Sequence, residues 1–226
     1  MKFLRTLVSA LLGGIAVGLS CTAYLLLKGD SPFGAAMVFA MGFLAVGVLD
    51  FSLFTDKSGN LFTTGNIEKN ISKLLTTLLG NITGVVVCAL SVRSQLYSVS
   101  NDLAQATISG SYFELFLNSV LCGMLVYIAL HSFRVAGGFT GSTTLILASI
   151  SLTLLSSGYS LFNVFILANG VTSFTTFTGN LYKIIVVVFL TAIGNVTGAV
   201  IFSLLSKFKD GTDDERHNDH QLKHHH

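Results

Sequence analysis

The chain has 226 residues, of which 51 % are hydrophobic and only 11 % are charged, and its mean hydropathy is +0.72. This composition excludes an ordinary soluble domain and indicates a membrane protein, while the small formal net charge of +2 gives no reason to expect nucleic acid as a partner. The sequence offers no catalytic constellation and no credible group of metal ligands, so we expect no enzyme, no cofactor and no metal site. Three widely spaced cysteines are expected to be packing thiols: Cys21, Cys88 and Cys122.

Charge-free runs, taken in chain order, predict the membrane spans. Five runs each have about the ~20 residues that a helix needs to cross ~30 Å of hydrocarbon. They are residues 6–27, 31–49, 74–92, 115–133 and 184–206. A sixth run, 135–182, is too long for one span and is interrupted by Gly and Ser, so it predicts a broken helix with a re-entrant or surface segment. The first run exceeds the core of a signal peptide, and we expect it to be a retained helix. The prediction is therefore an all-α membrane protein with six transmembrane helices.

The distribution of Lys and Arg predicts the orientation. With both termini in the cytoplasm, most of these residues fall on the inner side, as the positive-inside rule requires. The inner set is Lys2, Arg5, Lys69, Lys73, Arg134, Lys207 and Lys209, and the outer set is Lys28, Arg93 and Lys183. We therefore expect a multi-pass protein of the cell inner (plasma) membrane. The charged segment 207–226 is expected to be a disordered cytoplasmic tail that ends in a tag remnant, His224 to His226.

A short signature occurs twice and predicts an internal repeat. Gly80-Asn81-Ile82-Thr83-Gly84 returns as Gly194-Asn195-Val196-Thr197-Gly198, and Thr64-Gly65-Asn66 returns at the same spacing as Thr178-Gly179-Asn180. The channel domain 1–206 then consists of two repeats, about 6–95 and 112–206. Three helices in each repeat make the two inverted. The glycines at 80, 84, 194 and 198 should let helix backbones approach closely, and the two Asn amides should bind neighbouring backbone.

Two interruptions of apolar sequence point to a binding or conduction site. Turn-forming residues follow the second run at 53–60, and a counterpart lies at 156–163 within the long uncharged run. Irregular backbone at membrane depth is tolerated where it is buried in protein or lines a cavity. Paired interruptions before the third helix of each repeat thus predict broken second and fifth helices that meet at a pathway. The alternative is that residues 156–158 form only a short external loop.

Six short motifs lie along the predicted helices and loops: Phe39-x-x-Gly42-Phe43, Leu53-Phe54-Thr55, Leu79-Gly80-Asn81-x-x-Gly84, Cys122-Gly123-Met124-Leu125-Val126, Ser160-x-x-Asn163-x-Phe165 and Ile193-Gly194-Asn195-x-x-Gly198. In their order and spacing these motifs resemble those of the formate/nitrite transporter family. The resemblance implies six-helix, aquaporin-like subunits that form pentamers with one pore per subunit and carry small monovalent anions.

The same resemblance implies roles for single residues. Phe39, Phe43, Leu53 and Phe54 would form apolar constrictions, and Thr55 would be a polar donor at the pore centre. Ser160 and Asn163 would belong to the second loop of the pathway. The family has a Glu-His pair directly before that Ser, where this chain has Gly158 and Tyr159. Because Tyr has an unperturbed pKa near ~10, Tyr159 would stay neutral where a His shares a proton with a weak acid.

Two ionisable residues remain open at this stage. Asp50, at the end of the second run, is either a functional carboxylate or a group satisfied by loop amides or a salt bridge, and its charge would oppose an anion pathway. His131 is either an interfacial residue or a substitute proton-sharing group.

The function predicted from these observations is a channel or facilitator for a small monovalent anion or its weak acid, of the formate, nitrite or hydrosulfide type, with weak or absent His-based proton coupling. The partners would be a small-molecule solute, the lipid bilayer and four further copies of the chain. Two alternatives remain open: a channel for a neutral solute such as water, ammonia or glycerol, and a non-conducting substrate-binding subunit of a vitamin importer.

Overall fold

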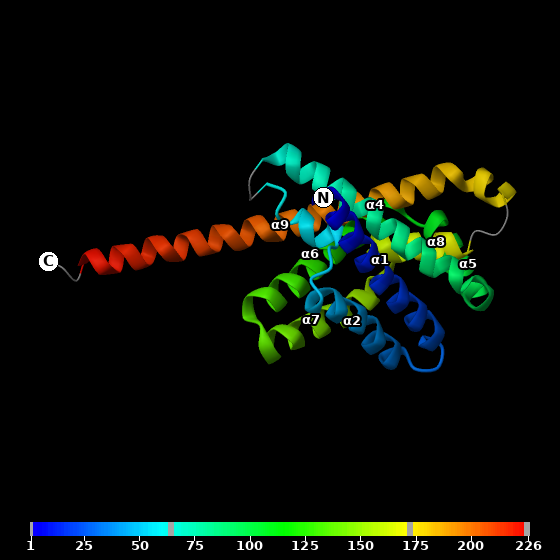
Figure 1. The fold of residues 1–226 in the computed structure, drawn as a ribbon, viewed down its shortest axis with the longest axis horizontal. Coiled ribbons are helices and arrows are strands. Elements are labelled where there is room, and N and C mark those ends of the chain that lie inside the picture. Colours follow the sequence, from blue (N-terminus) through cyan, green and yellow to red (C-terminus); the bar gives the residue numbers. More distant parts are fainter. Residues whose placement is uncertain (1, 63–65, 171–173, 224–226) are drawn as a thin grey trace.

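The computed structural model describes residues 2–62, 66–170 and 174–223, and their regular structure is helical (Figure 1). The first half contains α1 (Lys2–Leu27), α2 (Pro32–Val48), α3 (Phe54–Ser58), α4 (Ile67–Ser91) and α5 (Arg93–Ser109). The second half contains α6 (Tyr112–Ala136), α7 (Gly138–Leu154), a 3-10 turn (Ser156–Gly158), α8 (Ser160–Gly170) and α9 (Phe174–Lys223). Over these residues the all-helical prediction is confirmed. Thr64 and Gly65 of the repeated signature, and the terminal histidines, lie outside the described residues.

Four helices within the described residues are long and apolar enough to cross a membrane, namely α1, α4, α6 and α9. They correspond to the expected spans 6–27, 74–92, 115–133 and 184–206. The second expected span corresponds to α2, an apolar helix of only 17 residues that ends at Val48. It is followed by Asp50 with a φ of 50°, a left-handed conformation that no helix continues through. The long uncharged run divides into α7, the 3-10 turn, α8 and the beginning of α9.

Two parts of the chain differ from the expectation. Residues 93–109 form α5, a helix that the sequence analysis does not predict. The helix gives little hydrophobic signal, because it buries only about one residue in four and its composition is polar on average. Its buried residues are Leu96, Ser100, Ala104 and Ile108. At the other end of the chain, α9 continues as a helix to Lys223, where the sequence analysis expects a disordered tail (Figure 1). The only proline of the chain, Pro32, lies at the start of α2, so no proline ends α9.

The two halves pack through equivalent pairs of helices. In the first half α1 contacts both α2 and α4, and in the second half α6 contacts both α7 and α9. Between the halves, α2 contacts α7, while the short helices cross over: α3 contacts α9, and α8 contacts α4. The segments next to the two short helices therefore lie in the interior of the bundle.

Local sequence sets where several helices begin. Ser31 precedes α2 and accepts a hydrogen bond from the Gly34 amide, with Pro32 at the first helical position. Asn66 caps α4 by accepting from the Glu68 amide at 2.8 Å, and Ser111 caps α6. An acidic residue in the first turn of each of these two helices, Glu68 or Glu114, complements the helix dipole.

Candidate functional site

The segment between α2 and α3 is held by one buried amide, Asn81 of α4. Its Nδ2 donates to the carbonyl oxygen of Ser52 at 2.8 Å and to that of Ala10 in α1 at 2.7 Å. Its Oδ1 accepts from the Phe54 amide at 2.9 Å. Where the chain leaves helical geometry, its backbone groups lose their helical partners and need others inside the protein. Asn81 supplies those partners on both sides of Leu53.

Asn195 of α9 does the same for the segment between the 3-10 turn and α8. Its Nδ2 donates to the carbonyl oxygen of Gly158 at 2.9 Å and to that of Ser119 in α6 at 2.7 Å. Its Oδ1 accepts from the Ser160 amide at 3.1 Å. The two amides thus bridge equivalent atoms, the carbonyl of one residue and the amide two residues later. We call these two sets of contacts the asparagine clamps.

Glycines bring the clamping helices close to their neighbours. A Cβ on Gly84 of α4 would lie 2.6 Å from the Ile15 nitrogen of α1, and a Cβ on Gly198 of α9 would lie 2.8 Å from the Val120 carbonyl carbon of α6. Gly80 and Gly194 lie one turn earlier, against Leu7 to Leu11 of α1 and against Phe116 and Ser119 of α6. Gly123 occupies the position where the resemblance leads one to expect Asn. A Cβ added at Gly123 would collide with the backbone of Asn195. At these positions the two helices of each pair, α1 with α4 and α6 with α9, lie too close together for a side chain to fit between them.

Apolar residues from α2 and the first clamped segment enclose the interior. Phe39, Phe43, Leu53 and Phe54 are almost completely buried and belong, with Tyr159, to one contiguous cluster. The Phe39 and Phe43 ring centroids are 5.6 Å apart, and those of Phe43 and Tyr159 are 5.7 Å apart. The contact between Phe43 and Tyr159 joins the two halves at the clamped segments.

Polar atoms without partners lie beside these rings. Thr55 and Ser160 follow Phe54 and Tyr159 in the chain. The described part of the chain provides no hydrogen-bond partner for the Thr55 Oγ1, Tyr159 hydroxyl, Ser160 Oγ or Asn163 Oδ1 atoms, all of which are buried. The Asn163 Nδ2 donates to the carbonyl oxygen of Ser157 at 2.6 Å. A buried polar atom without a partner costs about 1–3 kcal/mol, so this set of atoms calls for water or a solute.

Tyr24 of α1 and Lys28, which directly follows α1, extend the aromatic cluster and were missed by sequence reasoning. The Tyr24 ring meets Phe39 edge-on at 5.7 Å and Phe162 of α8 at 6.0 Å. The exposed Lys28 places its Nζ 5.6 Å from the centroid of the Tyr24 ring. The sequence did contain a signal for this contact: Lys28 follows Tyr24 by one helical turn, at the end of an apolar run.

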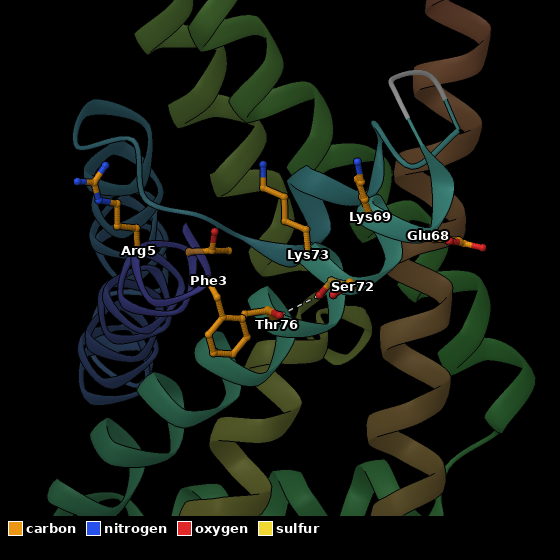
Figure 2. Close-up of a pocket in the computed structure, with 8 residues that line it drawn as sticks. Phe3, Arg5, Glu68, Lys69, Ser72, Lys73 and Thr76 are labelled. Atoms are coloured by element: carbon orange, nitrogen blue, oxygen red, sulfur yellow. Dashed lines mark hydrogen bonds between the residues drawn. The ribbon is translucent and has the colours of Figure 1, made fainter. Parts of the chain in front are cut away.

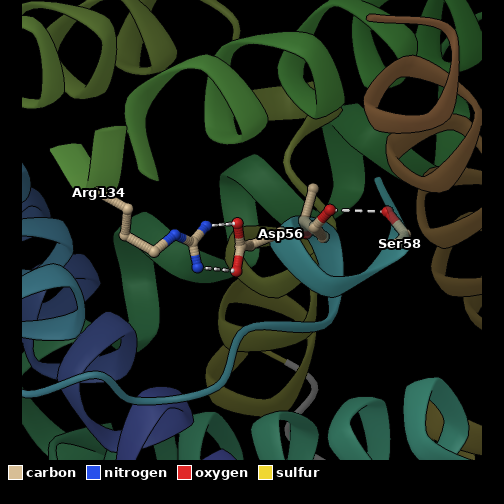
Figure 3. Close-up of polar contacts among 4 residues, drawn as sticks. Asp56, Ser58 and Arg134 are labelled. Atoms are coloured by element: carbon tan, nitrogen blue, oxygen red, sulfur yellow. Dashed lines mark hydrogen bonds and ion pairs between the residues drawn. The ribbon is translucent and has the colours of Figure 1, made fainter. Parts of the chain in front are cut away.

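An ion pair ties α3 to α6 and was also missed (Figure 3). The Arg134 Nη1 donates to the Asp56 Oδ2 at 2.9 Å, and the Nη2 donates to the Oδ1, so the pair is bidentate. Beside it, the Ser58 Oγ donates to the carbonyl oxygen of Thr55 at 2.6 Å. A sequence signal for Asp56 was available. Like Asp50, Asp56 is a carboxylate next to an apolar stretch, and it directly follows Thr55.

The structure gives other neighbours than the unpartnered hydroxyls to the two residues left open by the sequence. Asp50 is exposed and lines a small cavity together with Asp56 and Arg134. The His131 ring is stacked on Tyr127 with centroids 5.0 Å apart. Gly158, where the resemblance leads one to expect an acid, packs so tightly that a Cβ would lie 2.6 Å from the Ser119 nitrogen. A Glu does not fit there without moving α6.

A bundle of apolar helices around two clamped, non-helical segments defines a multi-pass membrane protein of the channel type. The chain belongs to the formate/nitrite transporter family, whose sequence model matches residues 1–208. No curated protein matches the sequence.

Several solved structures share the fold, and two channels are among them. One, an FNT family ion channel, has a TM-score of 0.77 at 23 % identity, over 92 % of this chain and 90 % of that one. The other, a pentameric formate channel with formate bound, has a TM-score of 0.78 at 18 % identity, over 93 % of this chain and 98 % of that one. At these identities the likeness establishes the fold.

Proposed function

We propose that the chain forms a membrane channel or facilitator for a small monovalent anion or its conjugate weak acid, of the formate, nitrite or hydrosulfide type. The observation that carries the proposal is the set of four buried polar atoms without partners, on Thr55, Tyr159, Ser160 and Asn163, next to an apolar aromatic cluster. A structural core pairs most such atoms or replaces them by methyl groups. Here four of them belong to residues in or close after the two clamped segments, where a pathway would present them to the solute.

In this mechanism the apolar side chains exclude hydrated ions, and the hydroxyls receive the solute once it has lost its water. The Phe39 and Phe43 rings of α2 form one apolar constriction of the pathway. Leu53 and Phe54, which belong to the first clamped segment, form another. The Thr55 hydroxyl and the Tyr159 hydroxyl can each donate to an anionic oxygen or sulfur. The clamped amides of Phe54 and Ser160 already donate to asparagine, so the hydroxyls rather than these two amides serve the solute.

Tyr159 sets the proton chemistry that we propose. A group with an ordinary pKa near ~10 neither gains nor loses a proton between pH 5 and 8. The solute therefore passes as the species that enters, with weak or absent proton coupling through this residue. The neutral centre also favours the second candidate, a channel for a small neutral solute such as ammonia, water or glycerol.

The architecture that we propose completes this picture. Residues 6–95 and 112–206 form two inverted three-helix repeats in an aquaporin-like arrangement, with α2–α3 and α7–α8 as broken second and fifth helices. Support comes from the equivalent helix pairs and the equivalent asparagine clamps. The structural likeness to a pentameric formate channel supports a homopentamer. The distribution of Lys and Arg supports a location in the inner membrane with both termini cytoplasmic. The segment from residue 207 then extends into the cytoplasm.

Uptake by proteoliposomes tests the proposal. We expect faster uptake of formate, nitrite or hydrosulfide than in empty vesicles. Thr55→Val and Tyr159→Phe each remove one hydroxyl at nearly constant volume and should slow uptake about tenfold or more, because a hydrogen bond to a charged group contributes about 1.5–3 kcal/mol.

Ser203→Ala is the matched control, since the Ser203 Oγ is also buried and unpartnered in the described chain but belongs to α9 outside the cluster. Equal uptake by protein-containing and empty vesicles for all three anions would reject the anion channel. Osmotic swelling with ammonia or glycerol under the same conditions would instead support the neutral-solute channel.

A further inference from the structure

A cavity of about 690 Å³ lies where the first turns of α1 and α4 come together (Figure 2). Its lining comes from both helices: Phe3, Arg5 and Thr6 from α1, and Glu68, Lys69, Ser72, Lys73 and Thr76 from α4. We propose that this cavity, the α1–α4 pocket, binds the phosphate headgroup of an anionic phospholipid. It lies apart from the solute pathway, with which it shares no residue.

The charges of the α1–α4 pocket favour an anionic ligand. Three cations, Arg5, Lys69 and Lys73, line it against one acid, Glu68. Among the residues whose side chains the structure describes, none of these three cations has an ion-pair partner. Lys69 and Lys73 lie one turn apart on the same helix face, where like charges repel each other. A bound phosphate would relieve that repulsion.

The directions of the side chains agree with this assignment. Figure 2 shows the Lys69 and Lys73 side chains extending the same way from α4, while Glu68 points away from Lys73 and Arg5. The amide of Glu68 is already taken by the Asn66 cap, so the pocket depends on side chains rather than on the start of the helix. The Thr76 hydroxyl donates to the Ser72 carbonyl oxygen at 2.9 Å, whereas the exposed Ser72 hydroxyl lies free to donate to a ligand.

Apolar surface beside the cations distinguishes a lipid headgroup from a free anion. Phe3, in the pocket itself, is 66 % exposed. Exposed apolar side chains continue further along both helices, with Val8 on α1 and Ile71 and Leu75 on α4. Both helices are long enough to cross the bilayer, so their first turns lie at the level of the headgroups. A phospholipid presents this combination, an anionic phosphate joined to acyl chains, and basic pockets between membrane helices recognise such headgroups.

The test measures lipid binding by the purified full chain with native mass spectrometry and thermal unfolding. The probes are phosphatidylglycerol, phosphatidylcholine and inorganic phosphate. We expect phosphatidylglycerol to remain bound and to raise the unfolding temperature, and the other two to do so much less. Each Lys near an anionic headgroup contributes on the order of 1 kcal/mol, so Lys69→Gln/Lys73→Gln should weaken phosphatidylglycerol binding about 25-fold.

The control Lys28→Gln/Lys183→Gln removes two exposed cations outside the pocket and should bind the lipid as the parent chain does. Lys69→Arg/Lys73→Arg keeps the charge and should retain binding, which separates loss of charge from loss of folding. Unchanged binding in Lys69→Gln/Lys73→Gln, or equal loss in the control, would overturn the proposal. Equal stabilisation by inorganic phosphate and by the lipid would replace the headgroup with a free phosphate. These readouts involve no solute flux, so failure of the proposed channel function would leave them unaffected.

Discussion

The two side chains of the Asp56–Arg134 ion pair differ strongly in their exposure to solvent. Removing one of them should therefore lower the free energy of unfolding by a different amount than removing the other. The Asp56 side chain is 3 % exposed, whereas the Arg134 side chain is 40 % exposed. Arg134→Met removes both donors to Asp56 and leaves a carboxylate buried without a partner. Removing one member of a buried ion pair in this way costs about 3–5 kcal/mol. We therefore expect the free energy of unfolding to fall by roughly that amount.

Asp56→Asn breaks the same pair from the other side. The neutral amide can still accept one hydrogen bond from the guanidinium of Arg134, and the other guanidinium nitrogen can donate to water. The loss should be nearer to a single hydrogen bond to a charged group, about 1.5–3 kcal/mol. Replacing both residues by apolar ones, Asp56→Leu/Arg134→Met, leaves no unpaired charge and should restore most of the stability lost in Arg134→Met.

The assay is unfolding of the detergent-solubilised protein by heat and by SDS titration, with Lys57→Met as the control. Lys57 also lies on α3, so its removal tests for a general effect of losing a cation there. The reasoning would be refuted if Arg134→Met and Asp56→Asn lowered stability equally, or if the double apolar variant were less stable than Arg134→Met alone. Because Thr55 precedes Asp56, Arg134→Met should also reduce solute flux in vesicles where the protein remains folded.

Two further perturbations test the clamps and the pathway. Asn81→Ala and Asn195→Ala each remove three hydrogen bonds and should lower the free energy of unfolding to a similar extent, about 2–5 kcal/mol. Asn169→Ala should lower it by less, because the Asn169 side chain makes one described hydrogen bond, to the Ala89 carbonyl oxygen at 2.7 Å. Thermal unfolding measures all three variants, and a loss in Asn169→Ala as large as in the other two would contradict the clamp assignment. Tyr159→His introduces a group with an ordinary pKa near ~6.5, which becomes cationic as the pH falls below that value and should then speed anion uptake. A pH profile of vesicle uptake identical to that of the parent chain would remove Tyr159 from the pathway.

The long apolar helices were predictable because length and hydropathy are properties of the sequence alone. The runs 6–27, 74–92, 115–133 and 184–206 needed no knowledge of their neighbours to indicate α1, α4, α6 and α9. Helix α5 was not predictable in this way. Its burial depends on contact with α8, and only a stripe from Leu96 to Ile108 marks the contact face. The continuation of α9 beyond residue 206 has no hydrophobic signal at all.

At the site, the repeated signature located Asn81 and Asn195 but not their partners. Sequence spacing says nothing about which carbonyl an amide will reach, and the partners of Asn81 lie at Ala10 and Ser52, far away in the chain. The Asp56–Arg134 pair was missed for the same reason, since its members come from α3 and α6. The tight packing at Gly158 likewise depends on where α6 runs, which explains why an acid is absent there.

The asparagine clamps separate scaffolding from lining. Two amides anchored in α4 and α9 satisfy the irregular backbone, so neighbouring side chains such as Thr55 and Tyr159 have no structural bond to keep within the described chain. Their chemistry can therefore be exchanged while the frame stays intact. A protein engineer who wished to retune the transported species would leave the two asparagines untouched and vary only the residues that they hold in place.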